Sequence, residues 1–185
     1  MIVIMLEAFS QMNGHIRSFD RGEQIFARGD ATGSLAIVLS GEVRLIRHEA
    51  DGRAVILQRA VTGNILAEAS LFSDTYHCDA MAASNSRLRF VARQVVLDRF
   101  ERDSDFARQW AQYLSAEVRL ARLRAEILAL KTTRQRLDAW LAWHGDLPGK
   151  GSWNRLAEEI GVSPEALYRE LAKQKPRKQG EMPNP

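Results

Sequence analysis

The sequence contains little that could support redox, metal or membrane chemistry. Its 185 residues include one cysteine, Cys78, which excludes an internal disulfide, a four-thiolate zinc site and an iron–sulfur cluster held by one chain. The longest apolar stretches, Met1–Leu6 and Leu35–Leu39, are far too short to cross a bilayer. The first residues also lack the basic leader and small-residue cleavage site of a secretion signal. A lone thiol fits a reducing compartment, so the sequence predicts a cytoplasmic protein without a membrane partner.

Motifs typical of enzymes are also missing. The four histidines are scattered along the chain without a His-x-His pair, whereas a metal oxygenase built on a β-roll needs clustered histidine and carboxylate ligands. There is no Gly-x-Ser-x-Gly elbow, phosphate loop or dinucleotide fingerprint. The sequence therefore predicts a protein that is not an enzyme and has no metal site.

The formal net charge of +3 is unevenly distributed. Residues 1–100 carry 11 basic and 11 acidic side chains, whereas residues 101–185 carry 15 basic and 12 acidic ones. All four tryptophans lie in this second part. A neutral first part and a basic second part indicate two modules with different partners.

Between Ile16 and Val91 the chain alternates between short apolar runs and breaks that contain glycine. The runs are Gln24–Phe26, Leu35–Leu39, Glu42–Arg47, Ala54–Ala60 and Leu88–Val91. Short strands separated by turns every eight to twelve residues or so are typical of an antiparallel sandwich or roll. Asp51-Gly52 is the clearest hairpin turn, because glycine adopts the positive φ that such turns require.

After Gln94 the sequence has few helix breakers until Gly145. Large apolar residues at helical spacing predict an amphipathic helix from Asp105 to Leu130; they are Phe106, Trp110, Tyr113, Leu120 and Ile127. This helix could pack only on its own sheet, or it could also pair with its copy in a second subunit. Its length favours the second alternative, so these five residues are predicted to line a homodimer interface. A further helix is expected over Thr132–Trp143.

Residues 152–171 have the spacing of a helix-turn-helix. Ala157 is small where the two helices cross, and Gly161 is suited to the left-handed conformation that ends the first helix. Ser163 is a good N-cap and Pro164 suits the first helical turn. The predicted shared core consists of Leu156, Ile160, Val162, Leu167 and Leu171.

The second helix of this motif is predicted to read DNA. In a recognition helix, N-terminal side chains reach base edges in the major groove, where Arg can bond guanine and Glu can accept from cytosine. Glu165 and Arg169 lie one turn apart and could do both. Basic residues after them would contact backbone phosphates. The predicted DNA-binding residues are Ser163, Glu165, Ala166, Tyr168, Arg169, Lys173 and Lys175.

These pieces in this order resemble the Crp/Fnr family of bacterial transcription regulators. The resemblance is carried by Phe19-x-x-Gly22-x-x-Ile25-Phe26-x-x-Gly29-Asp30, Leu39-Ser40-Gly41-Glu42-Val43-Arg44-Leu45, Ala67-Glu68-Ala69-Ser70-Leu71-Phe72 and Glu165-x-x-x-Arg169. It implies an α+β fold: an antiparallel β-roll effector domain (a double-stranded β-helix) over residues 1–102, a dimerisation helix over 103–131 and a helix-turn-helix domain over 132–185. It also implies a homodimer that binds double-stranded DNA, responds to a small-molecule effector and contacts RNA polymerase.

The chain departs from the family in the segment that holds a cyclic nucleotide. Glu68 and Ser70 match the early positions of that segment, but Cys78 stands where the phosphate-binding arginine is expected, and Asp79 follows it. Losing the arginine removes a bidentate charge-assisted contact, and a carboxylate beside a phosphate adds like-charge repulsion. Tight binding of cyclic AMP is therefore not expected. The predicted effector pocket consists of Glu68, Ala69, Ser70, Leu71, Cys78 and Asp79.

The role of Cys78 has several interpretations. The first is a buried small apolar residue on a strand, which is how most free cysteines behave. The others, in order, are contact with an unknown organic effector, a redox-sensing thiol, and haem ligation by His77 or Cys78. Because adjacent strand residues point to opposite faces, His77 and Cys78 are not expected to bind one metal together.

The end of the chain also departs from the family, whose members usually continue into a two-stranded wing. Here Lys175–Pro185 contains three prolines, which favours a loose tail and predicts a reduced or absent wing. The resemblance further implies a hinge around Lys131–Thr133 that passes the effector signal to the DNA-binding helices. The alternative function is an effector sensor whose degenerate helix-turn-helix binds a protein partner.

Overall fold

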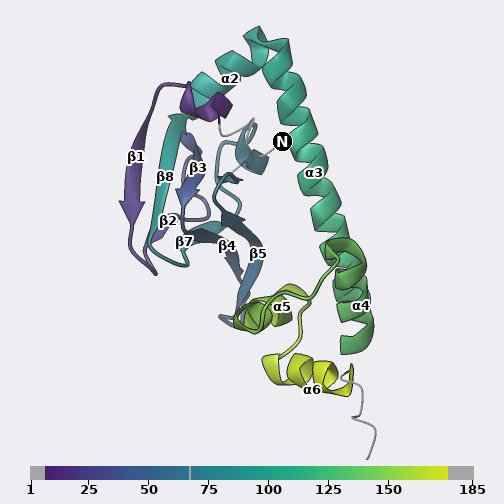
Figure 1. Cartoon of the computed structure of the whole chain (residues 1–185). Helices are drawn as coiled ribbons and strands as arrows, with labels where there is room; N and C mark the ends of the chain where they lie inside the picture. The colour runs from purple at the N-terminus through teal and green to yellow at the C-terminus, as the bar shows by residue number, and fades with distance from the viewer. Residues whose placement is uncertain (1–6, 67, 175–185) are drawn as a thin grey trace, which may run out of the picture. The chain divides into compact units, whose positions relative to one another are not determined.

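The alternating runs of the first half form two four-stranded antiparallel sheets, as Figure 1 shows for the computed structural model, which describes residues 7–66 and 68–174. In spatial order the first sheet contains β1 (Gly14–Phe19), β8 (Ser86–Ala92), β3 (Ser34–Ser40) and β6 (Ile65–Leu66). The second contains β2 (Gln24–Phe26), β7 (Asp79–Ala82), β4 (Glu42–His48) and β5 (Ala54–Val61). The predicted α+β class with an antiparallel β-roll is confirmed.

All five expected strands are present, and the hairpin at Asp51-Gly52 joins β4 to β5 with Gly52 at a φ of +81°. Strands β1, β6 and β7 were not expected over their observed ranges. Their sequences explain this, because β1 is mostly polar, β6 has two residues and the apolar residues of β7 are two alanines and a methionine. Such segments carry too weak a period-two signal to be recognised alone.

The inner faces of the two sheets form one apolar core. Alternate residues contribute to it, as in Val43 and Leu45 of β4 and Ala80 and Ala82 of β7, all nearly inaccessible to solvent. Cys78, directly before β7, belongs to the same core. The interior of the roll is therefore packed with side chains.

The other face of the β3–β8 sheet is covered by helices and forms a second core. Leu35 and Ile37 of β3 pack there with residues of α2 (Arg93–Arg102) and of the first half of α3 (Ser104–Ala129). Phe106, Trp110 and Tyr113 are only 1–2% exposed in this cluster. The Tyr113 hydroxyl also accepts a hydrogen bond of 3.2 Å from the backbone N–H of Ile65.

The assignment of these three aromatic residues of α3 to a dimer interface is therefore wrong. Because Phe106, Trp110 and Tyr113 are already buried against the sheet of their own chain, they have no surface left for a second subunit. The expected helix itself is confirmed, with bounds one residue earlier at each end than predicted.

Contacts divide the chain into residues 1–115 and residues 116–185, so α3 is shared between the two units. The second unit continues with α4 (Thr133–His144), the 3-10 helix η2 (Lys150–Ser152), α5 (Trp153–Glu159) and α6 (Pro164–Gln174). Its core contains Leu137, Trp140 and Ile127 together with the predicted helix-turn-helix residues. Ile127, being 3% exposed, is a further wrong dimer assignment, whereas Leu120 is 46% exposed. Within the described ranges, no helix is both long and apolar enough to cross a membrane.

Candidate DNA-binding helix and effector site

Helix α6 begins as its sequence predicts. Pro164 is its first residue, and the Ser163 hydroxyl accepts a hydrogen bond of 3.2 Å from the backbone N–H of Ala166. A hydrogen bond from its own backbone N–H, followed by one from Ser163, lowers the pKa of Glu165. The carboxylate therefore stays ionised at the helix N-terminus, where the positive end of the helix dipole also favours it.

The outer face of α6 carries the predicted DNA-reading side chains. Glu165, Tyr168, Arg169 and Lys173 are exposed, and Ala166 is partly exposed. Arg169 forms no ion pair with any described residue, whereas Lys173 pairs with Glu170 at 3.2 Å. Lys175 and the predicted loose tail lie outside the described residues, so the wing prediction remains a prediction. An unpaired arginine one turn beyond an ionised glutamate is the arrangement expected for reading base edges.

The turn before α6 is fixed by its backbone. Gly161 has a φ of +66°, and the N–H of Val162 donates to the Ala157 carbonyl at 2.9 Å. A Cβ atom at position 161 would lie 2.5 Å from Leu128 Cδ2, so another residue would strain the backbone at this positive φ and displace the Leu128 side chain. The turn therefore packs directly on the last residues of α3.

A single guanidinium joins the turn to the end of α3. Arg136 Nη1 donates to the carbonyls of Gly161 at 2.7 Å and Ile160 at 3.1 Å. Its Nε donates to Leu130 at 2.8 Å and its Nη2 to Leu128 at 3.0 Å. Because carbonyls at helix ends otherwise lack donors, Arg136 satisfies two termini at once. Sequence reasoning did not identify this residue.

A capping box adds further hydrogen bonds at the residue where α4 begins. The Thr132 hydroxyl accepts from the Gln135 backbone N–H, and the Gln135 side chain accepts from that of Thr132. This is the segment in which a hinge at Lys131–Thr133 was expected. Within residues 116–185 the segment is held by hydrogen bonds on both sides.

At the predicted effector site, the structure brings together Ser70 and His77. Ser70 is buried at the end of the short 3-10 helix η1 (Glu68–Ser70), and its hydroxyl lies 3.1 Å from His77 Nδ1. Burial, and then the positive charge of Arg47, lower the pKa of His77. Leu71 belongs instead to the core beneath the helices, and Ala69 is exposed.

Cys78 is a buried residue of the roll interior. It is 2% exposed, and burial, followed by the charge of Glu68, raises the pKa of its thiol to about 11. A thiol with such a pKa is almost entirely protonated near neutral pH, and the protonated form is a poor nucleophile and metal ligand. The first interpretation, a buried small apolar residue, agrees with this position.

The two candidate haem ligands lie on different sides of the chain. Cys78 points into the core, whereas His77 is exposed and contacts Ser70. In the part of the chain that the structure describes, no three His, Cys, Asp or Glu side chains are grouped as metal ligands.

Asp79 does not share the inner face with Cys78. Its Oδ1 accepts from the Arg28 backbone N–H at 2.8 Å, and its Oδ2 lies 3.2 Å from His48 Nδ1. Because β7 residues alternate between faces, Asp79 lies on the outer face while Cys78 and Ala80 lie on the inner one. Its assignment to the effector pocket is wrong, and so is the argument that its carboxylate would repel a ligand phosphate.

Sequence reasoning missed Arg47, whose Nη2 donates to the His77 carbonyl at 3.1 Å. Its strand was predicted, but its neighbour depends on the pairing of β4 with β7, which the sequence alone does not reveal. A separate surface hollow of about 410 Å³ lies on the outer face of the second sheet, lined by Arg21, Arg44, Ile46, Ile56 and Met81 among others. It contains none of the predicted effector residues.

The β-roll segment is similar to a known domain. Residues 16–103 match the family model of the cyclic nucleotide-binding domain. The predicted resemblance to the Crp/Fnr family is confirmed. A cyclic AMP receptor protein of Thermus thermophilus is 29% identical over 122 residues, or 65% of this chain and 56% of that relative. The match thus spans little more than half of the length of this relative.

Solved structures share the fold over more of the chain than the family model matches. FixK2 from Bradyrhizobium japonicum has a TM-score of 0.71 at 21% identity, covering 88% of this chain and 84% of that one. The c-di-GMP responsive global regulator CLP of Xanthomonas campestris has a TM-score of 0.63 at 22% identity, covering 97% and 95%. A CRP-family regulator from Thermus thermophilus has a TM-score of 0.62 at 20% identity, covering 85% and 83%.

Proposed function

We propose that this chain is a DNA-binding transcription regulator that senses an effector in its β-roll and reads DNA with α6. The observation that carries the proposal is the outer face of α6. There an ionised Glu165 lies one turn from Arg169, which forms no ion pair with any described residue. Ser163 caps this helix, and Arg136 holds the turn before it. Such a rigid helix presents its side chains to the major groove without a large cost in conformational entropy.

Dimerisation is part of the proposal, but through residues other than those first predicted. Val118, Ala121, Ala125 and Leu128 follow one another at spacings of three, four and three residues and are all exposed in the single chain. This is the a/d spacing of a coiled coil. The same spacing continues back to Leu114 and Ala111. Two copies paired along this seam would place two α6 helices on one DNA duplex, about one turn or roughly 34 Å apart.

Two further parts of the proposal concern ligands. Cyclic AMP binds weakly, because Cys78 cannot provide the charged contact of an arginine. Haem is not bound by His77 and Cys78, since their side chains lie on different sides of the chain. Contact with RNA polymerase is proposed from the family alone.

The test is DNA binding at several salt concentrations, with the wild type and two variants. Arg169→Ala removes a side chain that reads bases, so it should reduce the preference for specific over random DNA by about 1–3 kcal/mol. Lys173→Ala should weaken binding to all sequences alike and reduce the salt slope by about one unit. A wild type without any sequence preference would favour the alternative, a helix-turn-helix that binds a protein partner.

A further inference from the structure

An arginine on β4 lies opposite the position where the arginine of the cyclic nucleotide site is missing. The pairing of β4 with β7 ends at Ile46 and Asp79, and the same register extended by one residue would place Arg47 opposite Cys78. Side chains alternate along a strand, which places Arg47 on the same inner face as Leu45. Directly opposed residues have Cβ atoms about 4.5–5.5 Å apart. Arg47 and Cys78 are therefore neighbours across the sheet.

The guanidinium of Arg47 has a buried donor without an acceptor. Its Nη2 donates to the His77 carbonyl at 3.1 Å, but its Nε is inaccessible to solvent and has no hydrogen-bond partner among the described residues. Burying a charged donor without a partner is costly, and most buried polar groups in folded proteins are paired. An acceptor on a bound ligand would satisfy this Nε–H.

The groups next to Arg47 are suited to bind a polar ligand. His77, whose carbonyl accepts from Arg47, also contacts the Ser70 hydroxyl at 3.1 Å. Burial and the charge of Arg47 both lower the pKa of His77. At Cys78, burial raises the pKa, and the charge of Arg47 opposes part of that rise. The backbone carbonyl of His77 thus links the guanidinium of Arg47 to the segment whose imidazole contacts the Ser70 hydroxyl of η1.

We propose that Arg47 binds an oxyanion of the effector, so that the ligand is a small molecule carrying a phosphate or a carboxylate group. Arg47 provides from β4 the positive charge that position 78 lacks. Because its Nη2 is already bonded to the His77 carbonyl, it offers the ligand its Nε edge instead of a free bidentate fork. This explains how the site can bind an anion and still bind cyclic AMP weakly. The inference rests on the proposed sensing function of the roll.

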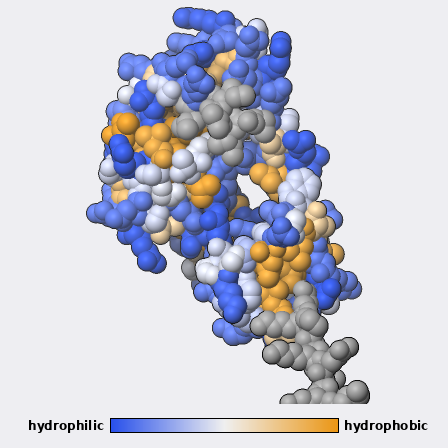
Figure 2. Space-filling view, in the orientation of Figure 1, coloured by the Kyte–Doolittle hydropathy of each residue, from blue (hydrophilic) through white to orange (hydrophobic). Residues whose placement is uncertain are grey.

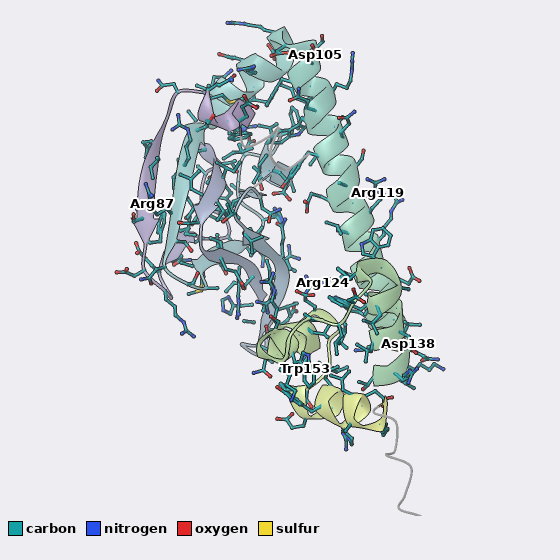
Figure 3. All side chains as sticks on the ribbon, viewed as in Figure 1. Arg87, Asp105, Arg119, Arg124, Asp138 and Trp153 are labelled. Carbon is teal, nitrogen blue, oxygen red and sulfur yellow. The ribbon has the colours of Figure 1, made fainter. Side chains whose placement is uncertain are left out.

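The experiment is calorimetric titration of the full chain with four probes: adenosine monophosphate, inorganic phosphate, succinate and adenosine. Adenosine monophosphate and inorganic phosphate carry a phosphate group, succinate carries carboxylate groups, and adenosine carries neither. Comparison of these probes therefore shows which oxyanion the site binds. Arg47→Gln removes the charge and the Nε–H. Arg87→Gln is the matched control, because Arg87 is an exposed arginine on β8 of the same roll (Figure 3).

The wild type and Arg87→Gln should bind at least one oxyanion probe but not adenosine, and Arg47→Gln should bind that probe roughly tenfold more weakly or worse. If Arg47→Gln does not fold, Arg47→Lys, which keeps the charge without the Nε–H, should still weaken binding several-fold. Unchanged affinity in the folded Arg47 variants, or a wild type that binds no oxyanion probe at millimolar concentration, would overturn the inference. DNA binding is measured separately on the same proteins. A wild type that does not bind DNA would contradict the proposed function and leave the inference about Arg47 to the titrations.

Discussion

The proposed DNA-binding end and the proposed effector end of this chain differ in the range of the contacts that build them. The cap of α6 spans three residues, and the core of the helix-turn-helix lies mostly between Leu156 and Leu171. At the effector end, Arg47 meets a carbonyl 30 residues away. Local contacts form with little loss of chain entropy, whereas distant ones require the whole sheet to be in place. The cap of α6 thus comes from its own segment, while Arg136 holds the turn before it from 25 residues away. The effector site depends on the pairing of strands.

The two ends also differ in how their surfaces are used. Hydrophobic residues gather over part of the helical unit on the face in Figure 2, whereas the roll surface there is mostly hydrophilic with smaller apolar patches. On α3, the seam residues Val118 and Leu128 are 47% and 40% exposed. Exposed apolar surface of this kind is typical of an interaction site.

The largest expected effect is that of Val118→Glu on dimerisation. The substitution would bury two unpaired carboxylates at the seam, weakening the dimer by roughly 3 kcal/mol or more, which is about 100-fold. Analytical ultracentrifugation measures the change. Leu120→Glu is the matched control, because Leu120 is equally exposed but lies about 200° around the helix from Val118. A dimer broken by Leu120→Glu and left intact by Val118→Glu would show that the seam is wrongly placed.

The next effect tests the long-range contact at the DNA-binding end, in which Arg136 meets the turn before α6. Arg136→Ala leaves four carbonyl groups without their donor and should lower the free energy of unfolding by about 3 kcal/mol. Urea denaturation followed by tryptophan fluorescence reports it, since Trp140 and Trp153 lie in this unit.

Arg134→Ala is the control for that experiment. Arg134 is two residues away on α4 and forms a surface ion pair with Asp138, which Figure 3 labels. A contact of this type contributes between zero and about 1 kcal/mol. Equal losses in the two variants would show that the guanidinium of Arg136 does not hold the turn.

The contrast in range also explains what could be predicted from the sequence. Ser163, Gly161 and the core of the helix-turn-helix were predicted correctly, because each residue's role follows from neighbours a few positions away. Arg47 was missed and Asp79 was placed on the wrong face, because both depend on the register between β4 and β7. The aromatic residues Trp110 and Tyr113 were assigned to a dimer for a similar reason, since periodicity shows a buried face but not which surface buries it.

The smallest expected effect concerns Cys78 and tests how well the roll interior excludes water. The thiol has a pKa of about 11 in the folded chain against 9.0 as its ordinary value. Its contribution to stability is therefore complete below pH 9 and is lost as the pH rises from 9 to 11, by at most roughly 2.7 kcal/mol. In urea denaturation across this range, Cys78→Ala should show a flatter alkaline decline than the wild type. Identical slopes in the two proteins would mean that the thiol is not desolvated.

The central claim is that α6 reads specific DNA as part of a dimer, and genome-wide footprinting in cells tests it most directly. The account predicts discrete sites, each with two half-sites whose centres lie about one helical turn, or roughly ten base pairs, apart. It also predicts that these sites disappear in Arg169→Ala while the variant protein stays dimeric. Footprints without a paired sequence, or the same paired footprints in Arg169→Ala, would contradict it.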